Sequence, residues 1–181
     1  MSIATRTGDD GSTGLLYGQR VPKDHPQVEA VGACDELNAA LGGAKALLPA
    51  GPGRDLLART QTALVALMGE LACAEADAGR YAASQFPKLS EVDLAGLDEA
   101  IAALEGRGLT FEGWATPGAN PPAAALDLAR VAARRAERRM SALPAAGRQV
   151  RPLARQFINR LSDLLWLLAR EAEAPRSPLG G

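Results

Sequence analysis

The chain has 181 residues and a formal net charge of −1, with 47% apolar residues but only 4% aromatic ones. This length suits a single domain with a sizeable core, and the near-zero charge excludes a global field that draws a protein to nucleic acid or anionic lipid. A core of mostly Ala, Leu and Val is typical of close-packed helices, because Ala and Leu rank high in helix propensity.

Residues 1–26 form the first segment, which is rich in Gly, Thr, Ser and Asp and carries Arg20 and Lys23 near its end. Its glycines allow backbone N–H groups to approach a phosphate, and its hydroxyls add further donors. The spacing GxxxxGK[ST] of a P-loop is missing. Taken alone, the segment is more typical of a frayed terminus.

Five stretches downstream carry the apolar period of a helix, and no stretch shows strand-type alternation. They cover residues 27–48, 54–79, 91–106, 122–143 and 150–172. Breakers rich in Pro and Gly separate them. We therefore expect an all-α, antiparallel five-helix bundle. The expected parts of this single domain (1–181) are the irregular segment 1–26, the bundle 27–172 with a long loop at 106–122, and a flexible tail 173–181.

In the first helix, Asp35 projects between Val28 and Val31 on an apolar face. A carboxylate in that position needs a partner, because an unpaired buried charge costs several kcal/mol. Arg130 is the natural candidate. The residues alone leave open whether such a pair is structural or functional.

The helix at 122–143 gathers arginines around a clear core face. The expected core residues are Leu126, Ala129, Ala132, Ala133, Ala136, Met140 and Leu143. Arg130, Arg134 and Glu137 lie together on one edge of that face, with Arg138 slightly further round. Arg135 and Arg139 point away, so we expect this outer pair to be solvated.

The last helix has two contrasting faces. Its expected core residues are Phe157, Ile158, Leu161, Leu164, Leu165 and Leu168. Its opposite face is expected to carry Asn159, Ser162, Asp163, Trp166 and Arg170. An amide, a carboxylate and an indole together indicate an interface or a ligand wall, and a solvated face is the alternative.

Residues that bind structural metals are scarce. Cys34 and Cys73 are the only cysteines, His25 is the only histidine, and none has zinc-ligand spacing. Free thiols in apolar surroundings indicate a reducing compartment. With no signal-peptide pattern and no apolar run of about 18 residues, we expect a cytoplasmic protein without nucleic-acid or membrane partners.

Four segments of the chain resemble the PduO-type ATP:cob(I)alamin adenosyltransferases. They are "TRTGDDGSTGLL", "VPKD…VEAVGACDELNAALG", "TPGANPPAAALDLARVAARRAERR" and "FINRLSDLLWLLAR". The resemblance spans nearly the whole chain in the right order. It implies a ferritin-like five-helix bundle that assembles as a homotrimer, with ATP and the corrinoid bound between subunits and an N-terminal segment that orders on binding.

The resemblance also implies the reaction, in which the 5′-deoxyadenosyl group of ATP moves to cobalt and triphosphate leaves. The implied ATP contacts are Thr5, Arg6, Thr7, Gly8, Thr13, Gly14, Lys23, Arg134, Arg135, Ala136, Glu137, Arg138 and Asn159. The residues implied in catalysis are Arg134, Arg130, Asp35 and Trp114. Mg²⁺ is expected to come with ATP rather than on a fixed motif, with Glu137 as a candidate ligand. Arg130 is implied to pair with Asp35 across a subunit boundary.

The cobalt chemistry is implied to depend on the loop "FEGWATPGAN". A bulky apolar side chain there excludes the lower axial ligand of cobalt and makes Co(I) reachable, and the matching position is Trp114. The chain departs from the family pattern in three places. Trp114 replaces the usual Phe, "PGA" replaces "PGG", and Asp127 stands where a His is common. Phe111 is a rival for the role of Trp114 if the loop register shifts.

Other partners follow from the same resemblance. An adenosylcobalamin-dependent mutase is an expected recipient of the product, and a flavin reductant is an expected source of electrons. The competing hypothesis is a catalytically silent corrinoid- or nucleotide-binding chaperone or sensor on the same bundle. The set Arg134, Glu137, Arg138 and Asn159 favours the enzyme, because a pure scaffold has no need of all four.

Overall fold

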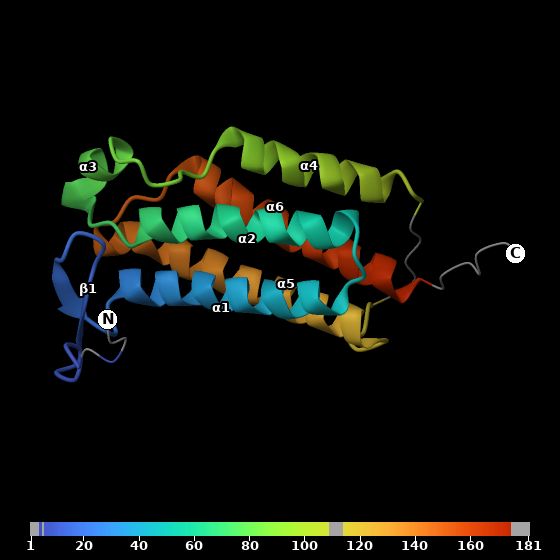
Figure 1. The fold of residues 1–181 in the computed structure, drawn as a ribbon, viewed down its shortest axis with the longest axis horizontal. Helices are drawn as coiled ribbons and strands as arrows, with labels where there is room; N and C mark the ends of the chain where they lie inside the picture. Colours follow the sequence, from blue (N-terminus) through green and yellow to red (C-terminus); the bar gives the residue numbers. More distant parts are fainter. Residues whose placement is uncertain (1–3, 5, 109–113, 175–181) are drawn as a thin grey trace, which may run out of the picture.

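The structure is a computed structural model that describes residues 4, 6–108 and 114–174. Its long helices are α1 (Pro26–Leu47), α2 (Pro52–Leu71), α4 (Glu91–Glu105), α5 (Pro121–Ala142) and α6 (Pro152–Glu173). These five lie side by side along the long axis of the molecule (Figure 1), and the expected helix bundle is confirmed. The shorter elements are β1 (Ser12–Gly14), β2 (Arg20–Pro22), η1 (Glu75–Asp77), α3 (Ala78–Ala82) and η2 (Leu143–Ala146). Of the expected tail 173–181, residues 175–181 lie outside the described residues.

The core lies between α5 and its neighbours, because α5 packs against both α1 and α6. The expected core face of α5 is buried except for Ala132, which is partly buried, and every expected core residue of α6 is buried. Small Ala side chains on α5 meet Leu side chains from the neighbouring helices, which allows close packing. Within the described residues, no helix combines the length and the apolar character needed to cross a membrane.

Helix α2 ends at Leu71, eight residues before the predicted end at Gly79. Side chains from other elements donate hydrogen bonds to the backbone carbonyl groups at its end. Gln27 Nε2 donates to the carbonyls of Leu71 (2.6 Å) and Cys73 (2.8 Å), and Arg148 Nε donates to the same Cys73 carbonyl at 2.9 Å. Helical carbonyls at a terminus need such partners, and here tertiary contacts override the helical period.

The N-terminal segment contains an antiparallel hairpin, so the expectation of no strands is wrong. Thr13 of β1 lies opposite Val21 of β2. The hairpin is fastened to the end of the bundle where α1 begins (Figure 1): Leu16 N–H donates to the Ala72 carbonyl at 2.9 Å, and the Arg80 guanidinium lies 4.0 Å from the centre of the Tyr17 ring. Strands of three residues are too short to produce a recognisable alternation in sequence.

Candidate functional site

The turn before β1 brings two of the predicted phosphate contacts together. A Cβ at Gly8 would lie 3.0 Å from the Ser12 carbonyl oxygen and 3.1 Å from Lys23 Nζ, so the lysine ammonium rests against a position that only glycine leaves open. Lys23 N–H donates to the Gly11 carbonyl at 2.9 Å and fixes the lysine backbone beside the turn. Arg6 has φ of 58°, in the left-handed region that non-glycine residues rarely adopt.

Two residues that the sequence did not single out as ligand contacts hold this turn in shape. Arg20 Nη2 donates to the Thr7 carbonyl at 2.7 Å and also contacts Asp10 and Ser12. Asp10 accepts from Ser12 Oγ at 2.7 Å and from Ser12 N–H at 2.9 Å, and these hydrogen bonds lower the pKa of the Asp10 carboxyl. Asp-Gly-Ser after a Thr-Gly is a turn signal that sequence reasoning can use.

The remaining predicted contacts of the N-terminal segment lie close by. Thr13 and Gly14 are on β1, with Thr13 half-buried and Gly14 exposed. Thr5 lies outside the described residues.

Four of the five arginines of α5 divide into two sets. Arg135 and Arg139 both pair with Glu29 of α1, at 3.1 and 3.0 Å, and Arg135 also pairs with Glu36. The hydrogen bond with Glu29 is the main cause that raises the pKa of the Arg135 guanidinium. The expectation that Arg135 and Arg139 are merely solvated is therefore wrong, because α1 presents carboxylates to them.

Arg134 and Arg138 form the second set, and both are exposed. Neither makes an ion pair within the part of the chain that the structure describes. Arg138 Nη1 donates to the Arg134 carbonyl at 3.1 Å, which holds its side chain along the helix. Two cations that no described carboxylate pairs with thus lie next to each other on one surface, an arrangement suited to a polyanion.

A carboxylate and an amide from adjacent helices meet on this surface. Asn159 Nδ2 of α6 donates to Glu137 Oε1 of α5 at 3.1 Å, which brings together two predicted ATP contacts from distant parts of the sequence. Ala136 is fully buried, so its side chain belongs to the core rather than to this surface. Among the described residues, no three His, Cys, Asp or Glu side chains gather in a way that could hold a metal ion. A single half-buried carboxylate such as Glu137 still fits Mg²⁺ that arrives bound to phosphates.

The predicted pair Arg130–Asp35 is not formed within one chain. Arg130 Nε donates to Asp127 Oδ1 at 3.0 Å instead. Asp35 is exposed rather than set in an apolar face, and no ion pair within the described residues includes it. The Arg130–Asp35 pair across a subunit boundary, which the family resemblance implies, stays a prediction.

The polar face predicted for α6 is only partly right. Asn159 and Asp163 are exposed and Trp166 is half-buried, as that face requires, but Ser162 and Arg170 are buried. Arg170 turns inward because Asp127 of α5 supplies a buried counter-charge.

Trp114 lies on the loop between α4 and α5, at the end of the bundle away from the hairpin, and 99% of it is exposed. An indole that the described residues leave uncovered marks a contact surface for a ligand or a partner. In the following "PGA" turn, Gly118 has φ of 110°, which favours glycine there. The rival Phe111 lies outside the described residues.

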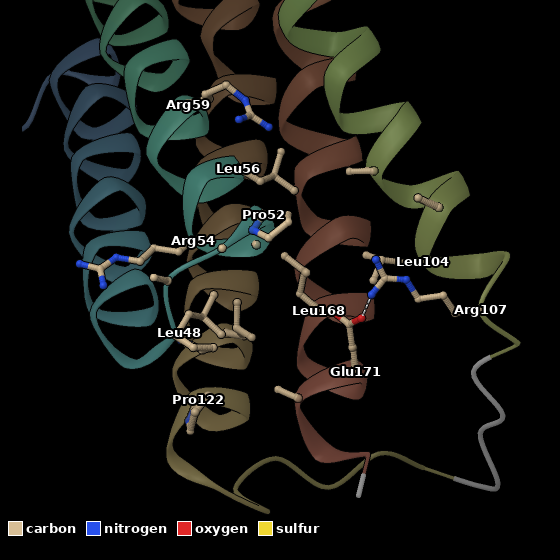
Figure 2. Close-up of a pocket in the computed structure, with 18 of the residues that line it drawn as sticks. Leu48, Pro52, Arg54, Leu56, Arg59, Leu104, Arg107, Pro122, Leu168 and Glu171 are labelled. Atoms are coloured by element: carbon tan, nitrogen blue, oxygen red, sulfur yellow. Dashed lines mark hydrogen bonds and ion pairs between the residues drawn. The ribbon is translucent and has the colours of Figure 1, made fainter. Parts of the chain in front are cut away.

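A cavity of about 680 Å³ opens at this same end, where α2 begins and α4 and α6 end. Figure 2 shows that its labelled side chains include Leu48, Leu56 and Leu168, with an ion pair between Arg107 and Glu171 at one side. None of the predicted site residues lines this cavity. Apart from the buried Ala136, the described ATP contacts instead lie on or beside the open surfaces of the N-terminal turn and of the α5–α6 junction.

Comparison with known proteins gives consistent similarities. The family described as "Cobalamin adenosyltransferase" matches residues 3–172. The chain is 42% identical to the corrinoid adenosyltransferase PduO of Citrobacter freundii, over 94% of this chain and 49% of that protein. It is 35% identical to the corrinoid adenosyltransferase of Bacillus subtilis, over 99% of this chain and 90% of that protein. It thus spans about half the length of the PduO proteins that it matches.

Solved structures agree in fold. A variant of the PduO-type ATP:corrinoid adenosyltransferase from Lactobacillus reuteri, complexed with cobalamin and ATP, superposes with a TM-score of 0.84 at 32% identity, covering 95% of this chain and 91% of that one. Another variant of that protein, complexed with ATP, superposes with a TM-score of 0.82 at 30% identity, covering 94% of both chains.

Proposed function

The chain belongs to the cobalamin adenosyltransferase family, and from this premise we propose that it transfers the 5′-deoxyadenosyl group of ATP to the cobalt of cob(I)alamin. The electron pair of Co(I) forms the bond to C5′ as the C5′–O bond breaks, and the bonding electrons leave with triphosphate. The observation that carries this proposal is the surface where α5 and α6 meet. It presents Arg134 and Arg138, which make no ion pair with any described residue, beside the Glu137–Asn159 hydrogen bond.

Charge on the leaving triphosphate explains why these groups are needed. Arg134 and Arg138 offer cationic donors where negative charge develops, and fixed donors of this kind stabilise the transition state without reorganisation. We assign residues 1–26 as the nucleotide-binding segment, with Lys23 held against Gly8 as a further phosphate contact. Glu137, oriented by Asn159, would hold Mg²⁺, which supplies further neutralisation of the phosphates when bound.

Trp114 is the proposed contact to the corrinoid. Its exposed indole is available to cover the lower face of cobalt and to exclude water or the axial base. Trp is apolar and larger than the Phe usual at this position, so exclusion of the ligand is retained.

We propose a homotrimer with the sites between subunits. Leu128 and Val131, on the same helix α5 as Arg134 and Arg138, are 66% and 48% exposed, and exposed apolar side chains near an open polar surface suit an interface. In that assembly Asp35 of one subunit would meet Arg130 of the next. A flavin reductant as the electron source and an adenosylcobalamin-dependent mutase as the recipient belong to the same proposal. So does a cytoplasmic location, which suits the two buried free thiols Cys34 and Cys73.

The experiment is an anaerobic assay with ATP and chemically reduced cobalamin, followed by absorbance. Conversion of the Co(I) spectrum into the light-sensitive spectrum of adenosylcobalamin is the expected result. Binding of ATP and cobalamin without conversion would favour the silent binding protein and contradict the proposed activity. Omission of ATP is the control for non-enzymatic change of the corrinoid.

A further inference from the structure

Asp127 is a buried carboxylate shared by two arginines. Its side chain is 5% exposed, Oδ1 accepts from Arg130 Nε at 3.0 Å, and Oδ2 accepts from Arg170 Nη2. Each carboxylate oxygen therefore serves one guanidinium. A buried carboxylate is stable only with such partners.

The Arg170 side of this arrangement is anchored in the fold. The Arg170 side chain is 3% exposed, pairs with Glu173 at 3.0 Å, and lies 5.9 Å from the centre of the Trp166 ring. The Asp127 carboxylate is thereby fixed between α5 and α6. Its position is set by contacts that do not involve the proposed active surface.

The Arg130 side faces outward. The Arg130 side chain is 24% exposed, and Asp127 engages it through Nε. Within the described residues, no hydrogen bond or ion pair uses its two terminal nitrogens. Because guanidinium is planar with several donor edges, a carboxylate at Nε leaves the terminal edge available for a second carboxylate.

We propose that Asp127 is a positioning residue, which holds Arg130 through Nε so that its terminal nitrogens point toward Asp35 of the neighbouring subunit. The inference rests on the proposed function, because it assigns to Asp127 the task of pre-orienting an active-site arginine. A freely rotating Arg130 would lose side-chain entropy each time the intersubunit pair formed, and Asp127 removes that cost in advance.

The test is Asp127→Asn, which keeps the shape and removes the charge, with Glu173→Gln as matched control. Glu173 belongs to the same buried network through Arg170 but does not contact Arg130. For Asp127→Asn we expect kcat/KM for cobalamin to fall by about tenfold or more, with an unchanged KM for ATP, whereas Glu173→Gln should stay within about twofold of wild type. Equal losses in the two variants would overturn the proposal, because they would indicate general damage to the network.

A double-mutant cycle with Arg130→Ala separates positioning from folding. If Asp127 acts through Arg130, adding Asp127→Asn to Arg130→Ala should cause little further loss of turnover. Multiplicative losses would refute the assignment. If Asp127→Asn fails to fold, the test uses Arg130→Lys instead, because an ammonium lacks the separate Nε edge. A lower kcat/KM for cobalamin at unchanged KM for ATP then supports the proposal. Wild-type kinetics overturns it. Absence of adenosyl transfer in the wild type would instead contradict the proposed function itself.

Discussion

Replacement of Arg134 by Ala is the sharpest perturbation of the proposed ATP site. The Arg134 side chain is exposed and has no ion pair within the described part of the chain, so its loss removes no core contact. Surface substitutions of this kind change the free energy of unfolding by about 0.5 kcal/mol or less. We therefore expect a folded protein with an unchanged melting temperature.

The effect on turnover should be far larger. A preorganised donor to charge that develops in the transition state contributes about 3–4 kcal/mol, which corresponds to a loss of about 10²–10³ in kcat. The KM for ATP should change less than kcat, because Lys23 and Arg138 still contact the ground-state triphosphate in the proposed site. The assay is steady-state formation of adenosylcobalamin from chemically reduced cobalamin at varied ATP.

Arg139→Ala is the matched control, because Arg139 lies on the same helix but pairs with Glu29 at 3.0 Å. That exposed pair contributes about 1 kcal/mol or less to stability, and its loss should leave kcat near the wild-type value. Wild-type kcat in Arg134→Ala would refute the assignment of Arg134. Equal losses in both variants would show that helix charge, rather than a placed donor, matters.

Three further predictions concern the corrinoid, the assembly and the core. Trp114→Ala should abolish the EPR signal of four-coordinate cob(II)alamin bound to the protein, and Trp114→Phe should keep it. A four-coordinate signal in the alanine variant would show that Trp114 does not exclude the lower ligand of cobalt. Asp35→Asn should leave the fold of the single chain intact but weaken the trimer, because loss of one partner of a desolvated ion pair costs about 3–5 kcal/mol. A trimer that is unchanged in sedimentation, with unchanged kinetics, would contradict the pairing with Arg130. Burial raises the pKa of the Cys34 thiol from 9.0 to about 12, so its contribution to stability is present below pH about 9 and is lost as pH rises toward 12. At pH 10 the loss should be about 1 kcal/mol in denaturant titrations relative to Cys34→Ala, and parallel pH profiles of the two proteins would disprove the effect.

Local signals were sufficient for most of the bundle. Ser90 before Glu91 and Asp93 predicts the start of α4, and the structure has the full capping box, with Ser90 N–H donating to Asp93 Oδ2 at 2.8 Å. The core face of α6 follows from its apolar period alone, because that face is continuous over the whole helix.

The differences arise where distant residues decide the outcome. Helix α2 ends early because Gln27 and Arg148 take its terminal carbonyls, and no pattern near Leu71 predicts that. Helix α1 presents Glu29 and Glu36 to Arg135, and the helical period of α5 alone does not predict these partners.

Asp127 could be placed only with the structure. From sequence it was a departure from the family pattern, and its two arginine partners lie three residues away on α5 and 43 residues away on α6. The sequence predicts Arg130 as the partner of Asp35 and places Arg170 on an outer face, because the helical period gives the face of each side chain but not the partner that a neighbouring helix presents.

The fate of the phosphates of ATP tests the central claim most directly. Incubation of the protein with reduced cobalamin and ATP carrying ¹³C at C5′ can be followed by ¹³C and ³¹P NMR in the same sample. The account predicts that the label appears in the alkyl carbon bound to cobalt and that one intact triphosphate is released for each adenosylcobalamin formed. Release of ADP and phosphate, or ATP that stays unchanged while bound, would contradict adenosyl transfer.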